Sequence, residues 1–143
     1  MSSTTIAARE WLALADTDPE HAYTWWDSNP DGYAIMPLGR LFDAVELSTV
    51  LAASVLGRPG TEGPALRDDL TGLVYVLVPP STAETWPHNL GLCLGSLRYL
   101  RVPAVTRCTQ PGLYWVTPPD GSGRLTDPAV LVTAITANRR VAK

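Results

Sequence analysis

The sequence GRLFDAVEL (residues 39–47) decides the fold, together with STVLAASVLG (residues 48–57), which follows it. The first stretch predicts a strand. The second predicts a helix that begins after a capping serine and ends at a glycine. Two carboxylates, Asp43 and Glu46, stand within the apolar strand. Because an acid in such a run is unusual and often marks a metal site, these residues are the first candidates for a functional site.

Further strands are predicted on both sides of this stretch. YAIMPLG (residues 33–39) precedes it and joins it at Gly39. LVYVLV (residues 73–78) is a continuous apolar run rich in β-branched and aromatic residues, which is typical of a buried central strand. LRYLRV (residues 97–102) and GLYWV (residues 112–116) complete a set of about five strands.

Capping residues and apolar periodicity predict further helices on both sides of the strands. These cover residues 2–15, 20–28 and 127–140, with a shorter one near the start of residues 81–95. In the first helix, Ala7, Trp11 and Leu14 form one apolar face. Neither an internal repeat nor a dividing linker is visible. We therefore expect a single α+β domain, residues 1–143, with a central mostly antiparallel or mixed sheet packed by helices.

The composition limits the classes of function. The chain has 143 residues and is 45% hydrophobic, which is enough to bury one core. A formal net charge of −3 does not favour general attraction to nucleic acid. Ten arginines against one lysine are typical of a bacterial gene of high GC content. There is no apolar signal segment and no run of the about 18 residues that span a membrane, so we expect a cytoplasmic protein outside the membrane.

The cysteines and histidines form no recognisable catalytic or zinc pattern. Cys93 and Cys108 are not a C-x-x-C pair, and their spacing with His21 and His88 fits no zinc motif. We interpret the cysteines as small core residues in a reducing compartment, and His88 as an exposed loop residue. Serine, histidine and aspartate occur without the spacing of a nucleophile elbow, so nothing supports a hydrolase.

The stretch WWDSNPDGYAIMPLGRLFDAVEL (residues 25–47) resembles the N-terminal domain of bifunctional DNA primase/polymerases of the archaeo-eukaryotic primase type (prim-pol). In that family a helix ending in W-W and a P-x-A turn lead into a strand with a T-G or L-G step, and a strand with paired catalytic acids follows. TGLVYVLVPP (residues 71–80) is similar to the family's second core strand, and GLYWVTPPDG (residues 112–121) to its final strand. The resemblance, from about Trp11 to Gly121, implies two divalent metals held by carboxylates that converge on one sheet face.

The sequence departs from the family at each element of that site. The family's paired acids stand at i and i+2, whereas Asp43 and Glu46 stand at i and i+3 and are expected on opposite strand faces. The family's histidine is absent, since Val74 and Tyr75 occupy its place. Its third acid is replaced in LRYLRV by arginines, which would repel a divalent metal. The resemblance therefore implies a small stand-alone member that has lost its metal site and its catalysis.

We accordingly expect a catalytically inactive prim-pol-like domain, without a metal cofactor, that acts as a binding or regulatory module through contacts with an unknown protein partner. Trp25 and Trp26 are the candidate anchors, and Trp86 and Trp115 are considered with them; the competing interpretation is that these tryptophans pack in the core or at its edge. Adjacent residues cannot share one helix face, so one of them is expected to pack inward and the other to lie at the helix edge. The many large apolar residues leave a homodimer open as well.

An enzymatic alternative stays open. If a β-bulge brought Asp43 and Glu46 together around Mg²⁺ or Mn²⁺, the chain would be a divergent nucleotidyl transferase. In the simpler interpretation, the two acids are solvated at the end of a strand or pair with Arg40.

A second alternative is non-catalytic binding of DNA or a nucleotide. Arg98, Arg101 and Arg107 would contact phosphates, because arginine suits phosphate geometry. Tyr99, which stands between them, could stack on a base. The competing interpretation is that three arginines within ten residues lie on an ordinary solvated strand.

Overall fold

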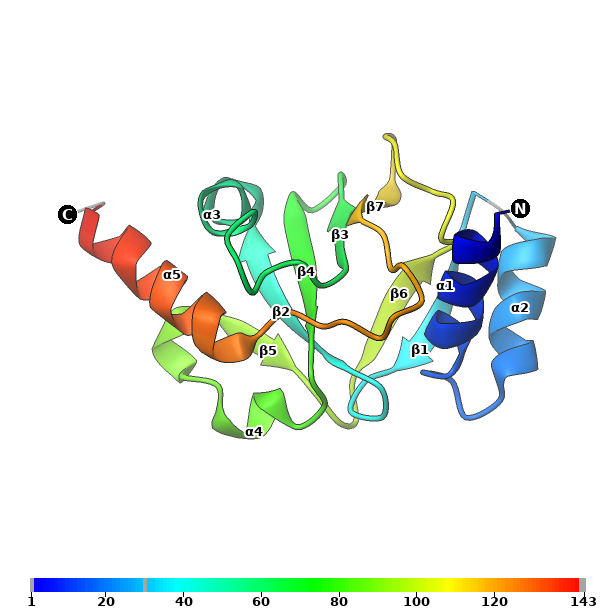
Figure 1. Ribbon diagram of the computed structural model, residues 1–143, viewed down its shortest axis with the longest axis horizontal. Coiled ribbons are helices and arrows are strands. Elements are labelled where there is room, and N and C mark those ends of the chain that lie inside the picture. Colours follow the sequence, from blue (N-terminus) through cyan, green and yellow to red (C-terminus); the bar gives the residue numbers. More distant parts are fainter. Residues whose placement is uncertain (1, 30, 142–143) are drawn as a thin grey trace.

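The computed structural model describes residues 2–29 and 31–141, and its helices and strands confirm the predicted α+β class (Figure 1). The elements in chain order are α1 (Ser3–Ala13), α2 (Pro19–Ser28), β1 (Tyr33–Pro37), β2 (Asp43–Ser48), α3 (Thr49–Val55), β3 (Ala65–Asp68), β4 (Leu73–Val78), α4 (Thr82–Thr85), the 3₁₀ helix η1 (His88–Leu90), β5 (Leu92–Leu94), β6 (Tyr99–Pro103), β7 (Leu113–Thr117) and α5 (Pro128–Val141). No helix among the described residues is long and apolar enough to cross a membrane.

The strands form two sheets. Five antiparallel strands stand in the order β5-β2-β4-β3-β7, and β1 pairs with β6 in a separate two-stranded ribbon. The apolar run of β4 is therefore central, as predicted. Residues 33–39 and 97–102 contain strands, as predicted, but these strands pair with each other instead of joining the central sheet. The unpredicted strands β3 and β5 complete the sheet. One cause is the turn at Gly39 (φ 92°), where the chain leaves β1 before β2 begins.

The sheet lies between two layers. Figure 1 shows α3 and α5 on one side and the ribbon with α1 and α2 on the other. Because neighbouring strand residues point to opposite faces, each face has its own hydrophobic core. Val45 and Leu47 pack toward α5, whereas Phe42 and Ala44 pack toward α1 and α2.

Two buried tryptophans hold the ribbon against the rest of the molecule. Trp26 Nε1 in α2 donates to the Val102 carbonyl at 3.0 Å, and Trp115 Nε1 in β7 donates to the Pro103 carbonyl at 3.2 Å. Trp26 is only 3% exposed, so the prediction that it anchors a binding partner is wrong. Trp25 next to it is 39% exposed, which confirms that one tryptophan packs inward and the other lies at the edge.

The predicted apolar face of the first helix was wrong in part: Trp11 packs against the core, but Ala7 and Leu14 are exposed. α1 buries Ala8 and Leu12, while Leu14 beyond its end is 51% exposed. Ala8 and Leu12 are themselves four residues apart, so they form a second apolar stripe beside the predicted one. Packing against the core selects this stripe, which the periodicity could not do.

Candidate functional site

Asp43 caps a helix. It is fully buried on the sheet face that packs against α4 and α5, and its Oδ2 accepts a hydrogen bond from the Ala83 backbone N–H at 2.9 Å. Ser81, the N-cap residue of α4, has φ 71° and makes no capping bond with its side chain among the described contacts. The carboxylate of Asp43 therefore replaces the missing cap from 40 positions away in the sequence.

The Asp43 carboxylate is in an unfavourable environment for a charge. Its Oδ1 is buried and has no hydrogen-bond partner in the described part of the chain. Burial raises the pKa of the Asp43 carboxyl above its usual value, the bond from Ala83 opposes that rise, and the charge of Glu84 adds to it. The interpretation of Asp43 as a solvated acid was wrong, because its side chain is fully buried. The pairing with Arg40 was wrong as well, because Arg40 donates to the Leu14 carbonyl instead.

Glu46 lies on the opposite face of the sheet. The β2–β4 register runs from Asp43 opposite Val78 to Ser48 opposite Leu73 without a shift, so β2 contains no bulge against β4. Glu46 stands opposite Tyr75. The strand phase predicted from the sequence is confirmed, and the bulge required by the enzymatic alternative is absent. Within residues 2–29 and 31–141, no three Asp, Glu, His or Cys side chains gather as a metal site would require.

A small cleft opens where the ribbon meets the face of the sheet that carries Glu46. Six residues line it: Tyr75, Leu94 and Leu113 from the five-stranded sheet, and Tyr99, Leu100 and Arg101 from strand β6 of the ribbon. We call it the sheet–ribbon cleft; its volume is about 90 Å³. Burial raises the pKa of Tyr75, and the charges of Glu46 and Asp68 raise it further, while Arg101 lowers it. The negative charges of Glu46 and Asp68 are therefore close enough to affect Tyr75, which lines the cleft.

Asp68 was not recognised as a site residue from the sequence. It is 2% exposed at the end of β3, and its Oδ2 accepts from Arg101 Nη2 at 2.5 Å. Its Oδ1 accepts from the Leu70 backbone N–H at 2.9 Å. Glu46 and Asp68 are separated by strand β4, or about 10 Å across the sheet. Asp68 is thus committed to Arg101 and to its own turn, and it does not form a carboxylate pair with Glu46.

The three predicted phosphate-binding arginines have different roles. Arg101 pairs with Asp68 and lies 5.4 Å from the centre of the Tyr33 ring. Arg107 donates to the Pro111 carbonyl and lies 3.6 Å from Asp31 Oδ1. Arg98 is exposed and forms no ion pair in the described part of the chain. Two of the three cations are therefore occupied by contacts within the fold.

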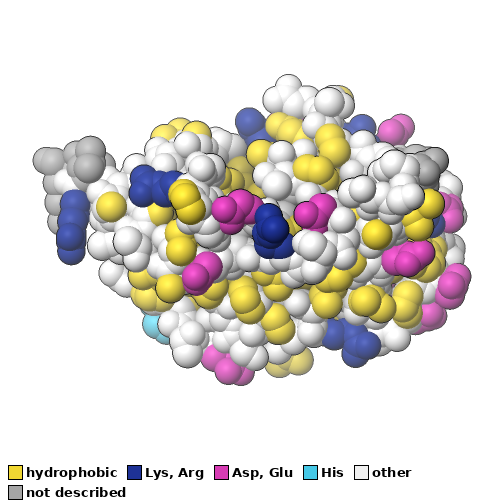
Figure 2. Space-filling view, in the orientation of Figure 1, with side chains coloured by type: hydrophobic (Ala, Val, Ile, Leu, Met, Phe, Trp, Pro, Cys, Tyr) yellow, Lys and Arg dark blue, Asp and Glu magenta, His cyan; other side chains and the backbone are white. Residues whose placement is uncertain are grey.

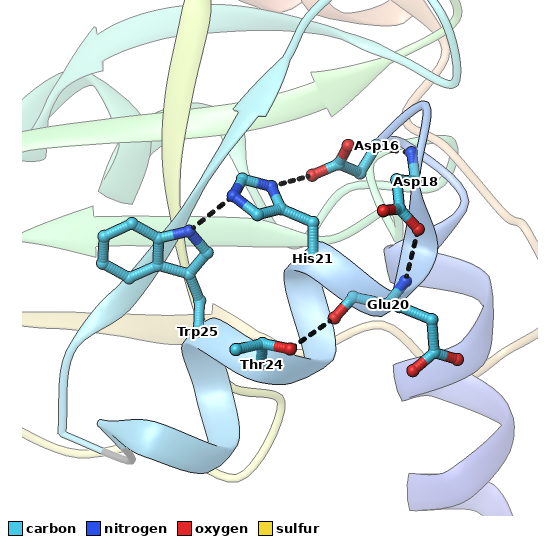
Figure 3. A network of polar contacts seen from close by, with 6 residues as sticks. All are labelled: Asp16, Asp18, Glu20, His21, Thr24 and Trp25. Atoms are coloured by element: carbon cyan, nitrogen blue, oxygen red, sulfur yellow. Dashed lines mark hydrogen bonds and ion pairs between the residues drawn. The ribbon is translucent and has the colours of Figure 1, made fainter.

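A polar network at the start of α2 has the outline of a catalytic dyad (Figure 3). His21 Nδ1 lies 2.9 Å from Asp16 Oδ2, and Trp25 Nε1 donates to His21 Nε2 at 3.0 Å. An indole N–H can only donate, so Nε2 accepts and the ring proton stands on Nδ1. Because the basic nitrogen is already used by Trp25, we interpret the network as structural.

The Asp16 carboxyl is fixed by its neighbours in the same network. Burial alone would raise the pKa of Asp16, but hydrogen bonds from the Asp18 backbone and from His21 outweigh it and lower the pKa. The Asp16 carboxylate is thus held in its charged form, and it orients the imidazole of His21 between α1 and α2.

The remaining candidates behave as packing or surface residues. His88 is exposed at the start of η1, and Trp86 and Trp115 are buried. Burial raises the pKa of the Cys93 thiol to about 12, so this cysteine is a poor nucleophile. No family model, curated protein or solved structure matches the chain. The prim-pol resemblance therefore rests on the quoted sequence motifs, and function has to be argued from the site.

Proposed function

We propose that this chain is a non-catalytic, prim-pol-like binding module that holds a protein partner at the sheet–ribbon cleft. The observation that supports it most is the direction of the two acids of β2. Asp43 faces α4 and caps it, whereas Glu46 lies on the other face of the sheet, opposite Tyr75 of the cleft. A two-metal site needs carboxylates that converge on one position, and this strand offers a single one on each face.

The surroundings of the cleft support a protein as the ligand. Three large apolar side chains are exposed on its walls or on strand positions next to them: Tyr99 (66%), Leu92 (46%) and Ile35 (43%). Leu92 precedes Leu94 by two residues on β5, and Ile35 pairs with Arg101 across the ribbon. Aromatic and aliphatic side chains beside an arginine are typical of the centre of a protein interface.

The distribution of charge supports a protein over a nucleic acid. On the face shown in Figure 2, the basic side chains of the described residues are scattered, and one at the centre lies between acidic side chains, so there is no continuous basic surface. At the cleft itself, the positive charge of Arg101 is balanced by Asp68. Nucleic-acid binding depends on several free cations along the phosphate backbone, and the cleft presents few of them.

The first prediction concerns catalysis. We expect calorimetric titration with Mn²⁺ to show no saturable site, and primer-extension assays with Mg²⁺ or Mn²⁺ to show no nucleotide incorporation. The physical reason is that Asp43 and Glu46 lie on opposite faces of β2. A saturable Mn²⁺ site that disappears in Glu46→Ala but persists in a Glu84→Ala control would contradict the proposal and support a nucleotidyl transferase.

The second prediction concerns the partner. A photo-crosslinking residue at position 99 should capture a protein in cells, and one at position 50, which is at least as accessible on α3, should not. The captured protein is then purified, and its affinity is measured directly. We expect Tyr99→Ala to weaken binding by about tenfold or more, because exposed aromatic side chains act as interface anchors, and Val50→Ala to leave it unchanged.

Three outcomes of the same experiment would redirect the proposal. Equal losses in Tyr99→Ala and Val50→Ala would place the interface elsewhere. Capture of a second copy, with a dimer in light scattering, would identify the partner as this chain itself. Single-stranded DNA binding that falls with salt and is lost in Arg98→Ala would support the nucleic-acid alternative instead.

A further inference from the structure

A second hollow lies on the opposite face of the sheet from the sheet–ribbon cleft. It runs between α3 and strands β3 and β7, and its volume is about 380 Å³. The lining residues are Thr49, Ala52, Ala53, Leu56, Gly57, Arg67, Val74, Val116 and Thr117. We call it the α3 groove. Its size falls in the range of about 300–1,000 Å³ that is typical of small-molecule sites.

The groove exists because α3 presents short side chains to the sheet. Ala52 and Ala53 cannot reach across to β7, where Val116 is 50% exposed. At the end of the helix, Gly57 has φ 91°, and a Cβ built there would meet no atom within 4 Å. An apolar wall is thus left uncovered on β7, opposite an open helix end.

Arg67 gives this apolar groove a positive charge. It is the one charged residue among the described residues that line the groove, and its side chain is about one-third exposed (35%). On β3 it stands between Val74 of β4 and Tyr114 of β7, so its neighbours across the strands are not acidic. Its Nε is buried without a hydrogen-bond partner in the described part of the chain.

Asp69 compensates the charge of Arg67 only in part. Its Oδ1 lies 3.3 Å from Arg67 Nε, a distance at which the two charges attract, although the two groups are not aligned for a hydrogen bond. The terminal nitrogens of an arginine form a planar fork that suits a carboxylate bidentately. No hydrogen bond of these nitrogens is found within the described residues, so the fork is available to a ligand.

We propose that the α3 groove binds a small amphipathic monocarboxylate. The carboxylate pairs with the guanidinium of Arg67, and the hydrocarbon part lies between Ala53 and Val116. The hydroxyls of Thr49 and Thr117 at the rim supply further polar contacts. This site is independent of the proposed partner interface, because alternate strand residues place Arg67 and Val116 on the face away from Tyr75.

The test uses a matched pair of probes, sodium hexanoate and hexanamide, followed by ¹H–¹⁵N correlation spectra of the full chain. The two probes have nearly the same size and differ in charge. We expect saturable shifts at groove residues with hexanoate, and an affinity for hexanamide lower by about tenfold or more, since hydrogen bonds between charged groups are the stronger ones.

Three variants separate charge from shape. Arg67→Gln should lower the hexanoate affinity about tenfold or more and leave that of hexanamide nearly unchanged. Ala53→Phe should abolish the binding of both probes, because Ala53 is exposed and a phenyl ring there fills the groove while the fold is kept. Arg98→Gln, a cation outside the groove, should change neither affinity. Equal affinities for the two probes, or hexanoate shifts that survive Ala53→Phe, would overturn the proposal.

Discussion

Trp115→Ala is expected to lower the free energy of unfolding by about 3–5 kcal/mol, the usual cost of emptying a large buried aromatic site. The indole of Trp115 is 1% exposed and fills the core between the sheet and the ribbon. The variant also leaves the Pro103 carbonyl without its indole donor. Urea unfolding followed by circular dichroism measures the change, which for a domain of this size is a large part of the total stability.

Two further variants identify the cause of that loss. Trp115→Phe keeps most of the ring volume and removes the N–H donor, so it should cost about 1–3 kcal/mol, the price of an unsatisfied buried acceptor. Val116→Ala, at the next position but half exposed, should cost about 0.5 kcal/mol or less. If Trp115→Ala were no more harmful than Val116→Ala, the ribbon would not depend on the indole contact described above.

The strands that were predicted correctly can be recognised from the apolar pattern of their own residues. β4 is apolar at all six positions because it is central, with Val74, Val76 and Val78 in one core and Leu77 in the other. β2 was likewise recognised as a short apolar run. Its end was recognised by Ser48, the N-cap of α3, whose side chain accepts a hydrogen bond from the Leu51 N–H. Such elements need no knowledge of their partners.

The elements that were missed depend on distant partners. β3 and β5 have four and three residues, too few to display alternation, and both are strands only because neighbouring strands pair with them. β1 and β6 read as ordinary half-buried strands. Nothing in their residues shows that they pair with each other instead of with the central sheet.

The site was predictable in part for the same reason. Strand period alone places Asp43 and Glu46 on opposite faces, and the structure confirms it. The partner of Asp43 could not be predicted, because Ala83 contributes a backbone N–H, which leaves no trace in the sequence. Asp68 was missed because it is followed by a second acid, Asp69, and by a turn that contains Gly72. In the sequence, such a polar segment is typical of a solvated loop. Only the fold shows that Arg101 faces it.

Asp43→Ala is expected to be less stable than Asp43→Asn by about 1–3 kcal/mol, the cost of a buried donor left without a partner. Alanine leaves the Ala83 N–H unsatisfied at the start of α4, where Ser81 offers no capping bond among the described contacts. Asparagine retains an acceptor oxygen and carries no charge. Both variants lack the titrating carboxyl, so their difference, measured by urea unfolding, should be the same from pH 4 to pH 7.

The wild type should differ from Asp43→Asn in a pH-dependent way. Burial raises the pKa of Asp43 above its usual value of 3.8, so between the two pKa values the folded state binds more protons than the unfolded state. The stability of the wild type therefore falls as the pH rises through that window, whereas Asp43→Asn is exempt from this loss. We expect the stability of Asp43→Asn relative to the wild type to increase from pH 4 toward pH 7. A constant difference would mean that burial does not raise the pKa of Asp43, whereas the capping of α4 is tested separately by the comparison of Asp43→Ala with Asp43→Asn.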